Sequence, residues 1–393
     1  MDGGRLPNVS LGGPLACVVT STFLHFASLY FLLPTLPLYA LSLGGTNAEV
    51  GLIIGILALT SLVARPFLGM WMDRTGRRGF LVAGAGIYVV AALGYWTINS
   101  VTGLLLWRVV QGIGLATFST AAASLAGDLA PPGRRGATMG VFGLAQAAAL
   151  TVGPGVGSRL LTTAGYPGLF MAAAGAALAA LICALVIPSR ALPDVGQARK
   201  RSMGGLPLRG TGSVPAIVQF AASIAYGTII SFIAVVARER GLDVVGAFFA
   251  LLALSSLGVR LFAGRAYDAW GPATTLAPLL VLLAAGMSVL AVAKAPLLFL
   301  LAAVPTGIGI GGAHTTLISA VVDRSTPESR ASSVAGFAAC WELGVGGGTI
   351  VMGQLADRVG FGAMFLAVAV LPLLGLVGPR WLRGPAWRRE EAA

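Results

Sequence analysis

Long apolar runs alternate with short polar, glycine-rich or proline-rich breaks along the chain. A helix needs about 20 apolar residues to cross the hydrocarbon core of a bilayer, and twelve runs are of about that length. Lipid offers the backbone no hydrogen-bond partner, so each run is predicted to form a helix. The runs cover roughly residues 14–38, 48–70, 80–98, 102–127, 136–160, 167–187, 213–236, 244–266, 274–293, 297–322, 332–356 and 362–380.

Composition also indicates a membrane protein. Hydrophobic residues make up 56% of the 393 residues and charged residues only 10%, whereas soluble domains carry about 25% charged residues. The net charge of +12 does not indicate nucleic-acid binding, because the basic residues are scattered between apolar runs. The three cysteines stand singly and predict neither a metal site nor a disulfide framework. No HExxH, GxSxG or carboxylate-pair motif is present, so we do not expect an enzyme.

The distribution of arginine and lysine predicts the orientation. With the N-terminus placed inside, the cytoplasmic segments hold eighteen of these residues and the outer segments hold five. Cytoplasmic loops carry the excess of positive charge, so we expect a multi-pass protein of the inner (cytoplasmic) membrane with both termini in the cytoplasm. Residues 188–212 are rich in Pro, Gly and Arg. They are expected to form a cytoplasmic linker between one bundle at 1–187 and a second bundle with a short tail at 213–393.

An internal repeat relates the two halves. At an offset of 195 residues, SLVARPFLGMWMDRTG (61–76) lies over SLGVRLFAGRAYDAWG (256–271). The same offset pairs Gly76 with Gly271, Gly112 with Gly307, Gly114 with Gly309, Asp128 with Asp323, Arg135 with Arg330, Gly165 with Gly360 and Phe170 with Phe365. The predicted fold is therefore an all-α integral membrane protein with twelve transmembrane helices in two pseudo-symmetric six-helix bundles. Such repeats place a transport site near the midplane between the halves.

A charged turn lies between the second and third predicted helices. Residues 64–78 read ARPFLGMWMDRTGRR and hold five charges. The segment GMWMDRTGRR resembles the loop 2–3 signature of the major facilitator superfamily, and WRVVQGIG (107–114) resembles its helix-four motif. The segment VGPGVG (152–157) resembles the helix-five motif of its antiporter branches. The alternative for Arg74, Arg77 and Arg78 is that they only set the topology.

The resemblance implies roles for the residues of these motifs. The charged turn would form a cytoplasmic latch that stabilises the outward-open state, and Gly69 would permit close helix approach. The latch residues would be Arg65, Gly69, Asp73, Arg74, Gly76, Arg77 and Arg78, with Arg260 and Asp268 as a degenerate second latch. Arg108 would support proton coupling or sense substrate charge. Gly153, Pro154 and Gly157 would let the fifth helix bend or pack.

One acid lies deep in a predicted span. Glu342 is about ten residues into the run 332–356, and hence about 15 Å deep. Burial favours the neutral form of a carboxyl group, which makes Glu342 a candidate proton carrier; the alternative is a structural pair with Arg108 or His25. His25 lies at a similar depth and is a second candidate for coupling, or else a packing residue. The alternative for Arg108 is snorkelling to the outer interface.

Further polar and aromatic residues within the predicted spans are candidates for the substrate cavity. They are Tyr30, Gln111, Gln146, Gln219, Tyr226, His314 and Trp341. Each of them is also compatible with simple packing between helices.

These features predict a secondary active transporter that couples the proton gradient to efflux of a small amphipathic organic solute or drug by alternating access. Two alternatives are proton-coupled import of a small metabolite and a non-transporting membrane sensor. The expected partners are the solute, protons and the lipid bilayer, with no nucleic acid and no metal. The proton gradient is the expected energy source, no cofactor is expected, and we expect a monomer.

Overall fold

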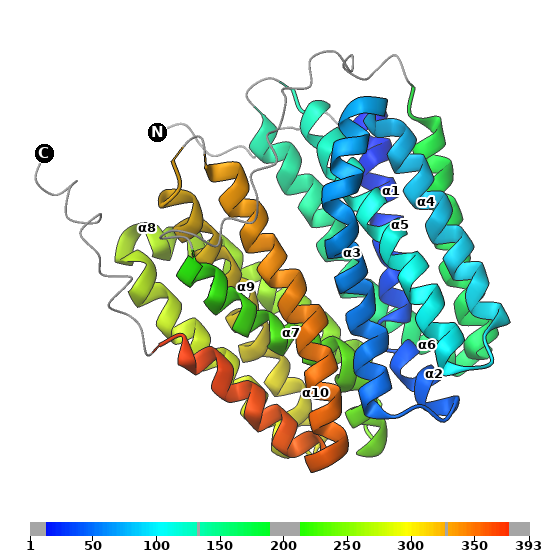
Figure 1. Cartoon of the computed structure of the whole chain (residues 1–393). Helices are drawn as coiled ribbons and strands as arrows, with labels where there is room; N and C mark the ends of the chain where they lie inside the picture. Colours follow the sequence, from blue (N-terminus) through cyan, green and yellow to red (C-terminus); the bar gives the residue numbers. More distant parts are fainter. Residues whose placement is uncertain (1–12, 132–133, 189–212, 327–328, 377–393) are drawn as a thin grey trace, which may run out of the picture. The chain divides into compact units, whose positions relative to one another are not determined.

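The computed structural model describes residues 13–131, 134–188, 213–326 and 329–376, and all regular structure within these ranges is helical (Figure 1). The helices are α1 (Gly13–Leu32), α2 (Leu36–Ser42), α3 (Asn47–Thr75), α4 (Arg77–Gly94), the 3-10 turn η1 (Tyr95–Thr97), α5 (Val101–Asp128), α6 (Arg135–Val186), α7 (Ser213–Glu239), α8 (Val245–Val292), α9 (Pro296–Asp323) and α10 (Arg330–Leu374). The predicted linker beyond Pro188 and the C-terminal tail lie outside the described residues.

Nine stretches of the described residues are long and apolar enough to cross a membrane. Three of them, α6, α8 and α10, run for 52, 48 and 45 residues, which is about twice the length that one crossing needs. Each is interrupted by a glycine with positive φ: Gly165 (66°), Gly271 (77°) and Gly360 (79°). Glycine adopts this left-handed conformation without steric penalty. These breaks are compatible with two crossings per long helix, so twelve crossings stay a prediction.

The turn glycines follow the repeat seen in the sequence. Gly76, between α3 and α4, has φ 98°, and its partner at the 195-residue offset is Gly271 within α8. Gly165 within α6 and Gly360 within α10 are a second pair at the same offset. The two halves therefore turn their chains at equivalent positions, with the same uncommon backbone conformation.

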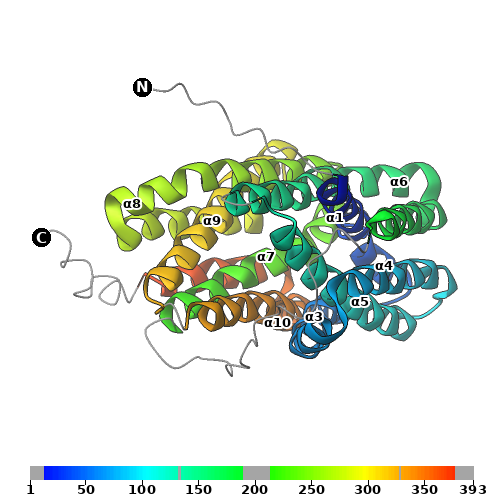
Figure 2. The ribbon, with the colours of Figure 1, turned by 90° about the horizontal axis from the view of Figure 1, so that it is seen from above.

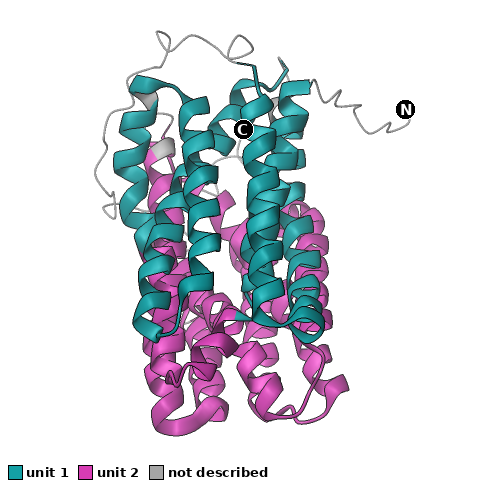
Figure 3. Ribbon diagram, turned by 90° about the vertical axis from the view of Figure 1, so that its right-hand side faces the viewer, with its two compact units in different colours: residues 1–35, 60–201 teal, residues 36–59, 202–393 magenta. Residues whose placement is uncertain are grey.

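The chain divides into two compact units, which Figure 3 shows in different colours. Unit 1 comprises residues 1–35 and 60–201, and unit 2 comprises residues 36–59 and 202–393. The division differs from the predicted bundle boundary for residues 36–59, because α2 and the first half of α3 group with unit 2. Helix α3 is continuous, so it belongs to both units.

Each unit has its own apolar core. In unit 1, α1, α4, α5 and α6 pack around a cluster that includes Leu81, Phe118 and Leu125. In unit 2, α7 to α10 pack around a cluster that includes Leu280 and Leu317. Figure 2 shows α4 beside α5 in unit 1 and α8 beside α9 in unit 2.

Large apolar side chains also cover the outside of the helices. Phe67, Trp71, Phe262 and Trp270 are each more than 60% exposed. A soluble protein rarely exposes apolar surface on this scale, whereas lipid stabilises it. The fold thus has an apolar exterior, and several of its polar side chains are buried inside.

Candidate functional site

A buried polar cluster lies in unit 1, where α5 follows the turn η1. Arg108 and Gln111 are one helical turn apart on α5, and both are essentially inaccessible to solvent. The Arg108 guanidinium donates a hydrogen bond to the Gln111 side-chain oxygen at 2.6 Å, and the Tyr95 hydroxyl donates to the same oxygen at 2.5 Å. Arg108 therefore turns into the unit, and the snorkelling alternative does not describe its conformation.

His25 extends this cluster from α1. Its ring stacks on Phe118 of α5 at a centroid distance of 3.8 Å, and lies 4.1 Å from the ring of Tyr88 on α4. The imidazole is fully buried, and neither of its nitrogens has a hydrogen-bond partner among the described residues. Tyr88 in turn lies within electrostatic reach of Tyr95, Arg108 and Gln111. The cluster thus joins side chains of α1, α4, η1 and α5.

An aromatic cluster occupies the corresponding interior of unit 2. His314 of α9 contacts Trp341 and Phe337 of α10 at centroid distances of 5.2 and 5.3 Å, and Tyr226 of α7 lies 5.2 Å from Trp341. Glu342 follows Trp341 in α10 and is half-buried. The structure therefore brings together three of the predicted cavity residues, Tyr226, His314 and Trp341. Trp341 directly precedes the predicted proton carrier, Glu342, in the sequence.

The other predicted cavity residues are dispersed. Gln219 on α7 is fully buried, and its amide has no hydrogen-bond partner among the described residues. Gln146 on α6 is half-buried. Tyr30 on α1 packs against Gly153.

The helix-five motif brings α6 close to α1. A Cβ atom added to Gly153 would lie 2.5 Å from Tyr30 Cβ, and one added to Gly157 would lie 2.8 Å from Phe31 Cα. Both distances are too short for a side chain, so only glycine permits this packing. Pro154 lies inside the same helix. In this conformation the motif serves close packing between the two helices.

The charged turn connects three helix ends of unit 1. Arg77, the first residue of α4, forms an ion pair with Asp128, the last residue of α5. The Arg78 guanidinium donates to the backbone oxygen of Leu185 near the end of α6 at 3.0 Å. Within α3, the Arg65 side chain donates to the hydroxyl of Ser61, one helical turn earlier, at 3.3 Å. The turn is thereby tied to its own bundle.

Three other predicted latch residues are Gly69, Asp73 and Arg74. The expected close helix approach at Gly69 is absent from this conformation, because a Cβ atom added there would meet no atom within 4 Å. Arg74 is exposed, and the side chain of Asp73 lies outside what the structure describes. The latch role of these residues stays a prediction.

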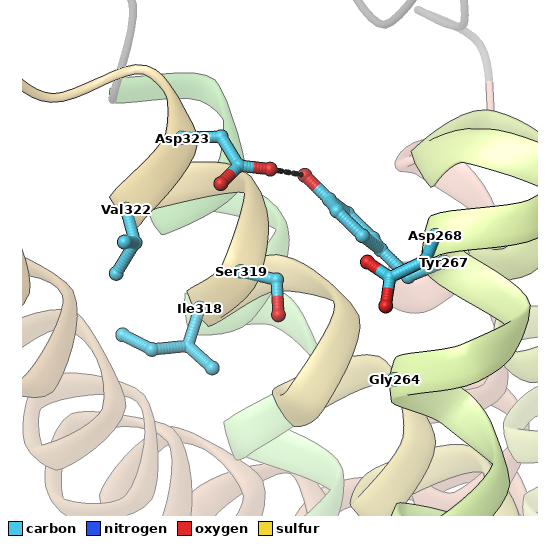
Figure 4. Close-up of a pocket in the computed structure, with 7 residues that line it drawn as sticks. All are labelled: Gly264, Tyr267, Asp268, Ile318, Ser319, Val322 and Asp323. Atoms are coloured by element: carbon cyan, nitrogen blue, oxygen red, sulfur yellow. Dashed lines mark hydrogen bonds between the residues drawn. The ribbon is translucent and has the colours of Figure 1, made fainter.

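The repeat-related position in unit 2 has different chemistry. Asp323, the partner of Asp128 in the repeat, accepts a hydrogen bond from the Tyr267 hydroxyl at 2.7 Å (Figure 4). Pro272 stands where Arg77 stands in unit 1. Asp268 and Asp323 line a pocket of about 300 Å³ between α8 and α9, and Arg260 is exposed two turns earlier on α8. A neutral tyrosine thus replaces the arginine of the first half.

Asp357 of α10 makes a contact that the sequence did not indicate. Its carboxylate accepts hydrogen bonds from the backbone N–H groups of Asn47 (3.1 Å) and Ala48 (2.8 Å), at the N-terminus of α3. These groups have no partner within their own helix, and a negative charge is favourable at that end. Close backbone contacts at Gly51 and Gly55 continue the packing of α3 against α10. All of these residues belong to unit 2.

The comparisons with known proteins define the family. The sequence matches the Major Facilitator Superfamily twice, over residues 18–216 and 215–392. The chain therefore belongs to this superfamily of membrane transporters, and the resemblance found in its motifs is confirmed. Each match covers one of the two halves that the internal repeat relates.

Three relatives show how far the similarity extends. The chain is 36% identical over 140 residues to an uncharacterized MFS-type transporter of Methanocaldococcus jannaschii (36% of each chain), and 27% identical over 173 residues to multidrug resistance protein 1 of Bacillus subtilis (44% of each chain). These alignments span less than half of either relative. An uncharacterized MFS-type transporter of Salmonella typhimurium is 28% identical over 380 residues, which cover 91% of this chain and 93% of the relative.

A solved structure shows the same fold. A bacterial homologue of the human lysosomal transporter Spinster, in an inward-facing and occupied conformation, superposes with a TM-score of 0.78 at 18% identity. The superposition covers 98% of this chain and all of that one. The family match, together with this fold, indicates a multi-pass membrane transporter rather than an enzyme.

Proposed function

We propose that the protein is a proton-coupled exporter of a small amphipathic organic solute. The observation that carries this proposal is the set of polar side chains inside apolar bundles, with Arg108, Gln111 and His25 fully buried in unit 1. Polar groups at membrane depth are costly, and they usually mark substrate or proton pathways. The similarity of part of the chain to multidrug resistance protein 1 of Bacillus subtilis supports export.

Coupling requires a group whose charge differs between the two conformations. Glu342 is the candidate proton carrier, since its carboxyl group can be neutral or charged, and His25 is the second candidate. Arg108 is a cation, so it acts by setting the electrostatic field around its neighbours. Protonation favours one conformation and solute the other, because only differential affinity shifts such an equilibrium.

Contacts at the helix ends stabilise the alternating states. On the proposed cytoplasmic side, the charged turn with Asp73 and Arg77 holds the outward-open state. On the proposed outer side, Asp357 holds the N-terminus of α3 and stabilises the state that is closed to the outside. Each of these contacts then sets the rate of one conformational step.

The Glu342→Gln variant tests this proposal in proteoliposomes with and without an imposed pH gradient. We expect gradient-driven transport of a drug-like cation or acid probe to fall to background while the melting temperature stays unchanged, because glutamine keeps the shape but cannot exchange a proton. The matched control is Glu239→Gln, an exposed acid at the end of α7. An unchanged response of Glu342→Gln to the gradient would reject Glu342 as the coupling site. The gradient direction that drives solute movement separates export from import.

A further inference from the structure

The buried cluster of unit 1 contains more hydrogen-bond donors than acceptors. The Gln111 side-chain oxygen already accepts from both Arg108 and Tyr95. The Arg108 Nε is buried and makes no hydrogen bond to a described residue, and the Tyr88 hydroxyl lies within hydrogen-bonding reach of the Gln111 side chain. Unsatisfied buried donors are costly and need an explanation. The missing partner must be an acceptor.

The cluster also carries a positive charge without a described counter-ion. Two acids lie in the described helices of unit 1, Asp73 and Asp128, and both are at helix ends. Asp128 pairs with Arg77. It follows Arg108 by 20 residues on α5, which corresponds to about 30 Å along the helix axis. A buried guanidinium is strongly disfavoured unless an anion accompanies it. The missing acceptor is therefore expected to be an anion.

We propose that this cluster binds the carboxylate group of the transported solute. The Arg108 guanidinium supplies the charge and a fork of N–H groups that suits a carboxylate, and the Gln111 amide and Tyr88 hydroxyl supply further donors. The aromatic ring of Tyr88, 4.1 Å from the ring of His25, adds apolar surface to the same cluster. This inference rests on the proposed function and narrows its solute to an amphipathic organic acid.

The single positive charge of the cluster selects the kind of acid. One guanidinium balances one negative charge, so a phosphate or a dicarboxylate would keep an unpaired charge in an apolar interior. The donor atoms are closed to solvent in this conformation. Loading and release thus need the conformational change of the transport cycle.

Equilibrium binding to the purified full-length protein in nanodiscs, without a pH gradient, tests the inference. The probes are 1-naphthaleneacetate and its neutral amide, 1-naphthaleneacetamide, which differ only in the charged group. The wild type is expected to bind the acid at least about tenfold more tightly than the amide, which corresponds to about 1.4 kcal/mol. Arg108→Gln should abolish this preference for the acid over the amide, whereas Arg159→Gln, which changes an exposed arginine of α6, should keep it.

A second variant keeps the test valid if Arg108→Gln does not fold. Gln111→Glu places a carboxylate beside Arg108 and should raise the melting temperature while it removes the preference for the acid. Equal binding of the acid and the amide by the wild type, or a preference that survives in both variants, would overturn the inference. The inference would also be overturned if chloride alone stabilised the wild-type protein and 1-naphthaleneacetate stabilised it no further. The binding experiment uses no pH gradient. A protein that binds the acid but shows no proton-driven transport would therefore contradict the proposed function and not this inference.

Discussion

Single residues decide how closely the helices of unit 1 approach one another. Gly157 shows this most clearly, because the backbone of Phe31 on α1 occupies the space that a side chain on α6 would need. The same long helix contains Gly175, where an added Cβ atom meets nothing within 4 Å. The two glycines have the same helical backbone but different surroundings, so their comparison separates packing from helix propensity.

The Gly157→Ala variant is expected to destabilise the protein by about 1–3 kcal/mol, the usual cost of overpacking a well-filled interface. Gly175→Ala should be neutral or slightly stabilising, because alanine favours helix over glycine. Thermal unfolding of both variants in detergent measures the difference. Equal melting temperatures for the two variants would show that α1 and α6 separate readily at Gly157.

Contacts at helix ends tie pairs of helices together within each unit. Asp357 of α10 caps the N-terminus of α3, and the glycines Gly51 and Gly55 continue the contact along both helices. In unit 1, the ion pair of Arg77 with Asp128 ties the beginning of α4 to the end of α5. These contacts lie at helix ends, where backbone groups without helical partners make hydrogen bonds to carboxylates favourable.

Asp357→Ala is expected to weaken the α3–α10 contact by about 0.5–2 kcal/mol, the usual value of a lost helix N-cap. The population closed on the proposed outer side should fall, so a cysteine placed at Gly45 should react faster with an impermeant maleimide. The control is Asp243→Ala, another exposed acid of unit 2 that caps no helix. If both variants label at the wild-type rate, the Asp357 contact does not control access.

At the scale of the whole molecule, the duplicated architecture predicts which loops share a side of the membrane. The 195-residue offset relates the turn at Gly76 to that at Gly271, and the break at Gly165 to that at Gly360. A parallel repeat of six helices returns the chain to the same side after each half. Equivalent turns must therefore face the same compartment.

Cysteine labelling in intact cells checks this topology in a variant without the native Cys17, Cys183 and Cys340. Cysteines at Thr75 and Thr326 should be protected from an impermeant reagent until the membrane is opened. Cysteines at Gly45 and Ala295 should react from outside. If Thr75 and Thr326 were labelled from opposite faces, the two-bundle scheme would be wrong.

The sequence by itself determined the class of the protein. Apolar runs of about 20 residues must be helical in lipid, and the motifs around Asp73 and Arg108 identified the superfamily. The contact between Arg108 and Gln111 also follows from sequence, since residues three apart share a helix face. The repeat pairs Asp128 with Asp323. This pairing was the signal in the sequence that both aspartates make structural contacts: Asp128 forms the ion pair with Arg77, and Asp323 accepts the hydrogen bond from Tyr267.

Only the tertiary structure decided which helix faces meet. Tyr95 and Tyr88 join Arg108 from other elements, His25 stacks on Phe118 of a different helix, and Asp357 caps a helix that begins 310 residues earlier. A helix that is apolar on all sides carries little periodic signal about its orientation. The rotation of each helix is set by packing against its neighbours, and this packing brings distant polar residues into contact.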